Sequence, residues 1–457
     1  MAPLPLLLFV AAAFAASLAN AAAYEWAWDR RRRSPWQPNP EGVPPRTWVD
    51  RLPIVGWLRL RRDAGVLGRG FWVRPMLVEV AFGAALVALW WWEVERLGLM
   101  TAQPGGAATI GDGGVAASLW WRAVAAFATH AVLAWLMLVA SLIDLDEKTI
   151  PDAVTVPGTL IALVLSAALP MAKPPNLEGR LGAERVAVAA ETASGVFLAD
   201  PQTGAPLWVE PTHVAAPGAW PAALAGGPNG RGALALGLAC YGLWCFALTP
   251  RVWRTSRGSL YGLAVLLQRV ARELRRRPLR EMLVAGGLLI AMVWFSGGAA
   301  WEGLLTGLVG MVASGGVVWA VRIVGSAALG KEAMGFGDVT LMMMVGAFLG
   351  WQAGLLTFFL APFAGLIVGA TQLLFRRGDV IPYGPFLCLA ASGVVVGWAT
   401  LWPRVERLFA LGVVVPVVLI VCLVLLGVLL ALWAQTKRLL GLTEDWEDEP
   451  DDGSVAG

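Results

Sequence analysis

The sequence predicts an all-α polytopic membrane protein with about 11 transmembrane helices, an outside N-terminus and a cytoplasmic C-terminus. Hydrophobic residues make up 58% of the chain and the mean hydropathy is +0.66, whereas soluble domains are only about 45–50% apolar. The apolar residues gather in runs of the ~20 residues that a helix needs to cross a bilayer. Lys and Arg gather between alternate runs, and this bias gives the orientation.

The apolar runs follow one another with charged or turn-forming residues between them. A signal peptide carries basic residues before its apolar run; the first run here has none, so we expect it to remain as a span. The run over 339–375 is too long for one helix, and Gly350 predicts a break within it. The predicted spans are 3–22, 76–95, 118–143, 154–170, 232–249, 282–300, 302–325, two within 339–375, 385–402 and 409–434.

These spans and their connections divide the chain into successive parts. The segment 172–231 mixes Pro, Gly and Asn with short alternating stretches, so a small β-rich lobe is the alternative to the loop that we favour there. The parts are an N-terminal transmembrane helix (1–28), a cytoplasmic Arg-rich loop (29–75), a first part of the membrane core (76–171), an exported insertion loop (172–231), inserted helices with a basic cytoplasmic loop (232–300), a second part of the core (301–402), and an extra helix with an acidic tail (403–457).

Charge supports this order independently of any motif. Cytoplasmic loops of membrane proteins carry an excess of Lys and Arg. Counting spans from an outside N-terminus places the basic segments 29–75, 250–281, Arg376-Arg377 and Lys437-Arg438 on the cytoplasmic side, and the sparsely basic 172–231 outside.

Cysteine and histidine offer little material for metal or nucleophilic chemistry. His130 lies in an apolar run, where we favour packing over a functional role, and His213 lies in a loop. No cofactor or metal is expected. The cysteines lie in apolar runs without a Cys-x-x-Cys pair, which predicts small buried thiols rather than a zinc site or disulfides; they are Cys240, Cys245, Cys388 and Cys422.

Two acidic motifs lie at the ends of apolar runs, and the span count puts both at the cytoplasmic boundary of the membrane. Ionisable groups at membrane depth are functional hypotheses by default. Asp144 ends a span, where the helix dipole disfavours a carboxylate, so it needs a compensating partner or else a raised pKa. Asp338 follows Gly335 and Gly337. It could cap the next helix, or be held where the glycines let a backbone or a substrate approach closely.

Other residues beside Asp144 could support it or compete with it. Asp146 is two positions away, so it faces elsewhere on a continuing helix. Asp152 follows Pro151 and precedes a span, which favours an N-cap role, although it could also support the site.

Paired carboxylates are suited to peptide hydrolysis. Two aspartates a few ångströms apart cannot both ionise cheaply, so they share one proton. The ionised partner can take a proton from an attacking water while the protonated partner polarises the scissile carbonyl. This chemistry needs neither a covalent intermediate nor a metal.

At these residues the sequence resembles the type IV prepilin peptidases, which belong to the GxGD aspartyl proteases. The first signature is an apolar helix ending in Ile-Asp followed by Pro-Asp, matched by Asp144, Pro151 and Asp152. The second is Gly-x-Gly-Asp, matched by Gly335, Gly337 and Asp338; the stretches 344–351 and Ile381-Pro-Tyr-Gly-Pro-Phe386 also resemble the family. The resemblance implies that Asp144 and Asp338 are the catalytic pair. It also implies prepilin or pseudopilin substrates cut on the cytoplasmic side of a bacterial inner membrane.

The chain departs from the family in three places. Bifunctional members carry two Cys-x-x-Cys pairs in the first cytoplasmic loop, linked to N-methylation; here they are absent, which excludes a zinc-held loop and leaves methylation open. The segment 172–300 separates the two motifs, and Thr340 stands where the family commonly has Lys.

Two other classes of function are weighed against a protease. A transporter or channel would use acidic residues to bind a cation or relay protons, usually nearer the bilayer midplane. A catalytically inactive scaffold is the third possibility. Neither nucleic-acid binding nor a particular oligomeric state is indicated.

Overall fold

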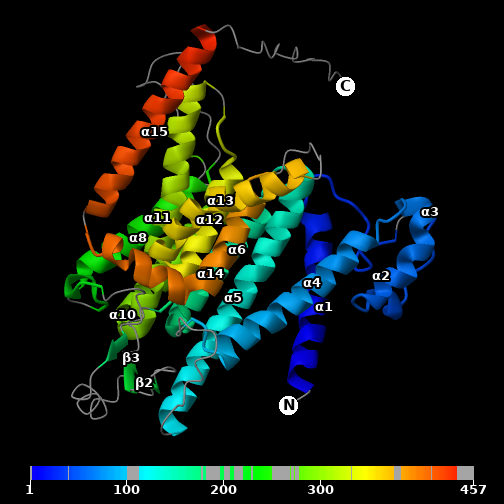
Figure 1. The fold of residues 1–457 in the computed structure, drawn as a ribbon, viewed down its shortest axis with the longest axis horizontal. Coiled ribbons are helices and arrows are strands. Elements are labelled where there is room, and N and C mark those ends of the chain that lie inside the picture. Colours follow the sequence, from blue (N-terminus) through cyan, green and yellow to red (C-terminus); the bar gives the residue numbers. More distant parts are fainter. Residues whose placement is uncertain are drawn as a thin grey trace. The chain divides into compact units, whose positions relative to one another are not determined.

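A computed structural model gives the fold (Figure 1). It describes residues 3–39, 41–99, 113–175, 179–181, 196–199, 206–209, 220–227, 230–249, 268, 272, 277–330, 332–374, 382–412 and 414–439. The chain forms two compact units: Met1–Val318 with Phe336–Arg407, and Trp319–Gly335 with Leu408–Gly457. The predictions for His213, for most of 250–281, for Arg376-Arg377 and for the acidic tail lie outside the described residues.

Helices dominate the described part of the chain, which confirms the prediction of a helical polytopic membrane protein; the count of about 11 spans and their orientation stay predictions. Eight of the described helices are long and apolar enough to cross a membrane, and three shorter apolar ones accompany them. The long ones are α1 (Pro3–Trp26), α4 (Val73–Trp90, extended by the π-helix η3, Trp91–Glu95), α5 (Gly113–Glu147), α10 (Arg277–Ser296), α11 (Gly298–Leu329), α13 (Trp351–Leu374), α14 (Gly384–Phe409) and α15 (Val414–Leu439); the shorter ones are α6 (Asp152–Ala168), α8 (Arg231–Ala247) and α12 (Phe336–Leu349). The predicted break lies at Gly350, between α12 and α13.

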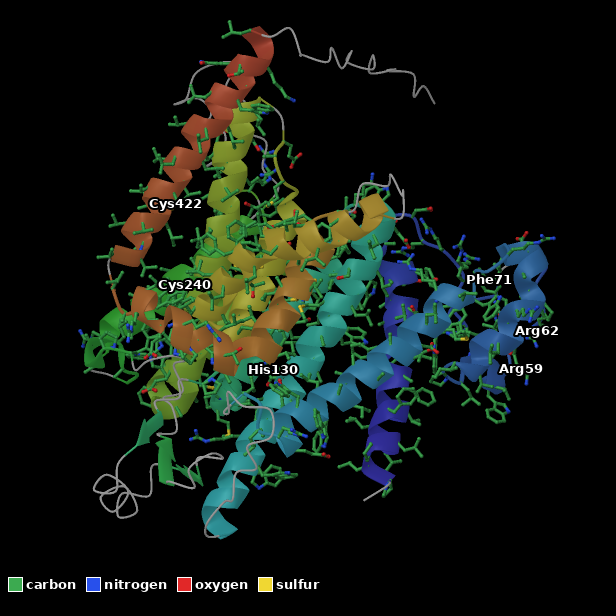
Figure 2. The ribbon with its side chains drawn as sticks, viewed as in Figure 1. Arg59, Arg62, Phe71, His130, Cys240 and Cys422 are labelled. Atoms are coloured by element: carbon green, nitrogen blue, oxygen red, sulfur yellow. The ribbon has the colours of Figure 1, made fainter. Side chains whose placement is uncertain are left out.

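Helices α1, α4 and α5 pack together at the N-terminal side of the larger unit (Figure 1). Ala12 and Ala16 of α1 lie against Phe82 and Leu86 of α4. His130 of α5, visible within the bundle in Figure 2, is buried and its Nδ1 lies 2.7 Å from Glu93 Oε1. Its Nε2 has no hydrogen-bond partner among the described residues. His130 therefore packs in the bundle as expected, but as half of a buried polar pair.

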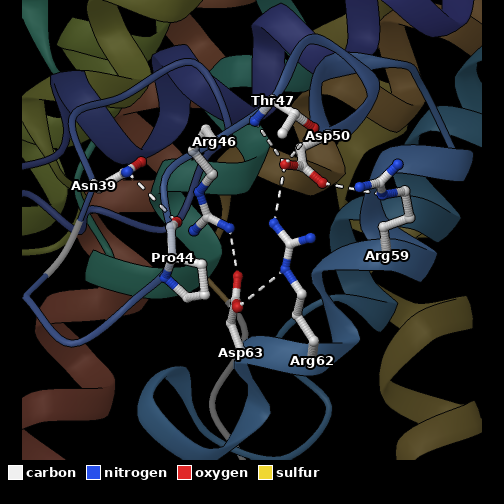
Figure 3. Close-up of polar contacts among 8 residues, drawn as sticks. All are labelled: Asn39, Pro44, Arg46, Thr47, Asp50, Arg59, Arg62 and Asp63. Carbon is white, nitrogen blue, oxygen red and sulfur yellow. Dashed lines mark hydrogen bonds and ion pairs between the residues drawn. The ribbon is translucent and has the colours of Figure 1, made fainter.

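The Arg-rich lobe, residues 29–75, folds without cysteines around an ion-pair network (Figure 3). It contains η1 (Trp48–Arg51), α2 (Val55–Leu60), η2 (Arg61–Asp63) and α3 (Ala64–Leu67). Asp50 accepts hydrogen bonds from the Thr47 amide, 2.8 Å, and from Arg62, 3.0 Å, and Arg46 pairs with Asp63 with both side chains almost fully buried. A small apolar cluster of Trp57, Leu60 and Phe71 completes the lobe; Phe71 is labelled in Figure 2.

The insertion contains strands, so the favoured loop prediction is wrong for the segments that form them. β1 (Gly179–Leu181), β2 (Val196–Ala199) and β3 (Pro206–Val209) make an antiparallel sheet in the order β1-β3-β2, with Val209 opposite both Gly179 and Val196. The short stretches of alternating sequence pair with one another because an extended strand forms its backbone N–H and C=O hydrogen bonds with a neighbouring strand. Between the sheet and α8 lies η5 (Ala222–Leu224), whose Leu224 carbonyl accepts a hydrogen bond from Trp301 of α11.

Helix α12 is the core of the larger unit, since every residue from Asp338 to Leu349 is buried. Glycines let its neighbours come close. A Cβ on Gly310 of α11 would overlap the Gly346 carbonyl of α12, and one on Gly158 of α6 would overlap Met344 of α12. This close packing fixes α12 between α6 and α11.

In the smaller unit, the last part of α11 is joined to the segment before α12. Arg322 donates a hydrogen bond to the Met334 carbonyl, 2.8 Å, and the Ala333 amide donates to Ser326 Oγ, 3.0 Å. Helix α15 is exposed along most of its length and carries Cys422 on its surface. The prediction of a buried thiol is therefore wrong for Cys422, but it is confirmed for the other three cysteines.

Candidate active site

Asp144 lies in the last turn of α5, where a sharp turn takes the chain towards α6. The Lys148 amide donates to the Asp144 carbonyl, 2.8 Å, and Lys148 itself takes φ +56°. A residue in this left-handed conformation commonly ends a helix, although it is usually glycine. The turn leaves the Asp144 side chain 3% exposed and directed into the helical bundle.

Asp338 lies in the first turn of α12 and is 8% exposed. Because the helix begins at Phe336, Asp338 is a helical residue rather than the N-cap, so the capping interpretation is not what the structure shows. Thr340 turns its hydroxyl back to the Gly337 carbonyl, 3.1 Å. Thr340, at the position where the family commonly has a lysine, is therefore buried, and its hydroxyl is hydrogen-bonded within the first turn of α12.

The two aspartates lie near enough for the charge of Asp144 to act on Asp338. Tyr383, just before α14, lies near enough to Asp338 to be affected by its charge. Cys388, one turn into α14, lies near Ser141 and near both aspartates. Helices α5, α12 and α14 therefore bring one cluster of side chains together from distant parts of the sequence.

Gly384 holds the Asp144 carboxylate at this cluster. Its amide donates a hydrogen bond of 3.1 Å to Asp144 Oδ2. A Cβ at this position would overlap Asp144 Oδ2 and lie only 2.9 Å from Ile150 Cδ1. Only glycine lets the backbone of α14 approach the carboxylate so closely.

Ile150 joins the two ends of the site. It is buried, and a Cβ on Gly337 would lie 2.9 Å from Ile150 Cβ and 3.1 Å from its amide nitrogen. Ile150 thus touches the start of α12 through Gly337 and the start of α14 through Gly384. The glycine before Asp338 is needed because the turn after Asp144 packs directly on it.

The cation at the end of α5 is Arg74, where the Arg-rich lobe joins α4. It meets Leu142 and Asp146, whereas the hydrogen bond to the Asp144 carboxylate itself comes from the Gly384 amide, so the expected charged partner of Asp144 is not found among the described residues. Arg74 donates to the Leu142 carbonyl, 3.3 Å, and also pairs with Asp146, which Arg31 meets at 3.4 Å. Glu147 accepts the amides of Trp28 and Asp29, each at 2.8 Å. A cation at a helix C-terminus offsets the negative end of the dipole, and here it also ties α5 to the lobe.

The remaining predicted residues lie around the site without entering the aspartate pair. Pro151 occupies the N-cap position of α6, and its carbonyl accepts the Val154 amide at 3.0 Å. Asp152 is the first helical residue, so the N-cap prediction for it is wrong; its carboxylate lies in the first turn, where the dipole is favourable. Gly335 is exposed at the end of the smaller unit's segment.

Sequence reasoning gave no role to Gly384 or Ile150. Gly384 belongs to a stretch that resembles the family, but nothing local shows which carboxylate its amide meets. Among the described residues, no group of three or more His, Cys, Asp or Glu side chains is placed to hold a metal.

The fold and the site together define a polytopic helical membrane protein with a buried pair of aspartates. Residues 263–370 match the type IV leader peptidase family. This match contains Asp338 with its glycines, and Asp144 precedes it in the chain. The match confirms the family resemblance over residues 263–370. Asp144 lies outside this range, but the structure places it at the same site as Asp338.

Curated relatives agree with this assignment. The chain is similar to prepilin leader peptidase/N-methyltransferases from Stutzerimonas stutzeri (35% identity over 134 residues, 27% of this chain and 43% of the relative), Aeromonas salmonicida strain A449 (34% over 150 residues, 30% and 48%) and Pseudomonas aeruginosa PAO1 (38% over 105 residues, 22% and 33%). The matches therefore span less than half the length of each relative. No solved structure matches the chain.

Proposed function

We propose that this protein is a membrane-embedded aspartic endopeptidase that cleaves the leader peptides of type IV prepilins or type II secretion pseudopilins. The single observation that carries the proposal is that the buried Asp144 and Asp338 lie at one site, because Ile150 touches both Gly384, which bonds Asp144, and Gly337, which precedes Asp338. The family match and the names of the similar proteins supply the reaction and the substrate class.

In this mechanism the aspartates share one proton. The ionised carboxylate removes a proton from a water molecule, which attacks the scissile carbonyl, and the other carboxyl group donates a hydrogen bond to the carbonyl oxygen. The tetrahedral intermediate then collapses as the leaving amine takes up a proton. The Gly384 amide supports this chemistry by fixing the orientation of the Asp144 carboxylate.

The site is proposed to face the cytoplasm of a bacterium with the protein in its inner membrane. The Arg-rich lobe supports this orientation, because Arg74 ties it to the same end of α5 that carries Asp144 and cytoplasmic segments are rich in arginine.

The test is leader cleavage by membranes that contain the chain, with mass spectrometry of a co-expressed pilin's N-terminus. Asp144→Asn and Asp338→Asn should each reduce cleavage by about 10²–10⁴-fold with expression unchanged. Asp29→Asn, the same change at an exposed side chain, should leave it intact.

Either single variant cutting at the wild-type rate would refute the assignment of the pair. Wild-type membranes that leave every leader intact would refute the protease and favour the ion-transport or scaffold alternatives. The mass of the new terminus also reports whether it is methylated.

A further inference from the structure

A buried lysine lies at the end of α12 opposite to Asp338. Lys173 follows α6 and the short helix η4 (Pro170–Ala172) and is 6% exposed. Its ammonium group donates to the Ala347 carbonyl at 2.6 Å, the Phe348 carbonyl at 2.9 Å and Ser166 Oγ at 2.8 Å. A lysine ammonium has three N–H donors, so all three are used.

Two of these acceptors, the Ala347 and Phe348 carbonyls, are groups that a helix end leaves unpaired. The last carbonyls of a helix have no intrahelical partner, and they carry the negative end of the helix dipole. α12 ends at Leu349, and Gly350, at φ +87°, turns the chain directly into α13. Lys173 therefore supplies both the hydrogen bonds and the positive charge that the end of α12 lacks.

The segment that carries Lys173 is itself held in place. Trp398 of α14 donates its indole N–H to the Pro175 carbonyl at 2.5 Å. Ser166 of α6 also donates to the Ala162 carbonyl at 2.7 Å and approaches the Ala347 carbonyl at 3.2 Å. Lys173 thus connects α12 to a fixed frame made by α6 and α14.

A constraint at this end of α12 reaches Asp338 because the helix is short and tightly enclosed. From Asp338 to Phe348 the helix rises about 15 Å, and all of its residues in that stretch are buried. Closely packed elements move as rigid bodies rather than deforming gradually. A shift or tilt at Phe348 is therefore transmitted to the carboxylate at the other end.

We propose that Lys173 is a positioning residue for the aspartate pair, anchoring α12 so that Asp338 is held opposite Asp144. The inference rests on the proposed peptidase function for its kinetic consequence. The anchoring itself is a property of the fold that can be measured without any substrate.

The kinetic test compares Lys173→Met, which fills similar space but removes every donor, with Lys173→Arg, which restores charge and donors. The kcat for leader cleavage should fall about tenfold in Lys173→Met, less than the ~10²-fold cost of a 1 Å misplacement, because the lost anchor acts on Asp338 only through the length of α12. The KM should stay within about twofold, and Lys173→Arg should recover part of the loss. Lys437→Met, the same change at an exposed lysine, is the matched control.

The second measurement is hydrogen–deuterium exchange in detergent, which needs no activity. Amides in the first turns of α12, residues 336–341, should exchange faster in Lys173→Met than in wild type. Ser166→Ala, which keeps both carbonyl contacts of Lys173, should have a smaller effect; it also serves if Lys173→Met fails to fold.

The outcomes separate the two proposals. Wild-type kcat and wild-type exchange in Lys173→Met would overturn the positioning role. A wild-type protein that never cleaves a leader, with faster exchange in Lys173→Met, would overturn the peptidase function and leave the anchor in place.

Discussion

Replacing Gly384 by alanine tests whether α14 fixes the Asp144 carboxylate. The added Cβ would lie 2.9 Å from Ile150 Cδ1 and 3.2 Å from Asp144 Cγ, and it would overlap Oδ2. Carbon atoms in contact prefer about 3.5–4.0 Å, so the carboxylate must retreat by roughly 1 Å. The hydrogen bond from the Gly384 amide, now 3.1 Å, would be stretched or lost.

The size of the effect follows from that displacement. A misplacement of about 1 Å in a reacting group can cost about 10²-fold in rate, which is about 2.7 kcal/mol of activation free energy. The expected loss is in kcat, because the displaced group acts in the chemical step. Gly384 is the first residue of α14 and does not have a positive φ, so alanine there does not weaken the helix itself.

The assay is the rate of leader cleavage in purified proteoliposomes, with Gly393→Ala as the control. Gly393 lies in the same helix, and a Cβ there would meet nothing within 4 Å. The control should cut at the wild-type rate and unfold at the same temperature or slightly higher. If Gly384→Ala cuts as fast as Gly393→Ala, the close approach of α14 to Asp144 is not what orients the carboxylate.

Two further predictions concern the surroundings of the site. Hydrogen bonds from Thr47 and Arg62 hold the pKa of Asp50 below its usual 3.8, although its burial alone would raise that pKa. The stabilisation of the folded lobe by ionised Asp50 is therefore complete above pH 3.8, and it is lost as the pH falls through the lower pKa that Asp50 has in the folded protein. Asp50→Asn should destabilise the Arg-rich lobe by about 1–3 kcal/mol at neutral pH. Limited proteolysis measures this, with Glu41→Gln at an exposed site as the control. Lys148→Gly should raise the stability of the turn after Asp144 by about 1 kcal/mol, since a side chain at φ +56° is strained; a lower thermal unfolding temperature than wild type would contradict this.

The amino-acid sequence by itself determined where the membrane helices lie and which carboxylates were candidates for chemistry. Hydropathy is local, and a bilayer requires every backbone group within it to be bonded in a helix, so apolar runs translate directly into the observed helices. The break at Gly350 and the end of α5 near Asp144 were predicted for the same reason. The helix caps were not predicted correctly, because Asp152 and Asp338 each lie inside the first turn of their helix. The exact first residue of a helix depends on local backbone geometry, which the sequence pattern does not fix to within one or two residues.

Only the tertiary structure decided how the site is assembled. The amide of Gly384 meets Asp144, Ile150 fills the space between Gly337 and Gly384, and Lys173 fastens the far end of α12. These contacts join residues that are distant in the chain, and they depend on how closely packed helices approach one another. No periodicity or local propensity carries that information, because it arises when side chains of different helices fill a common interior.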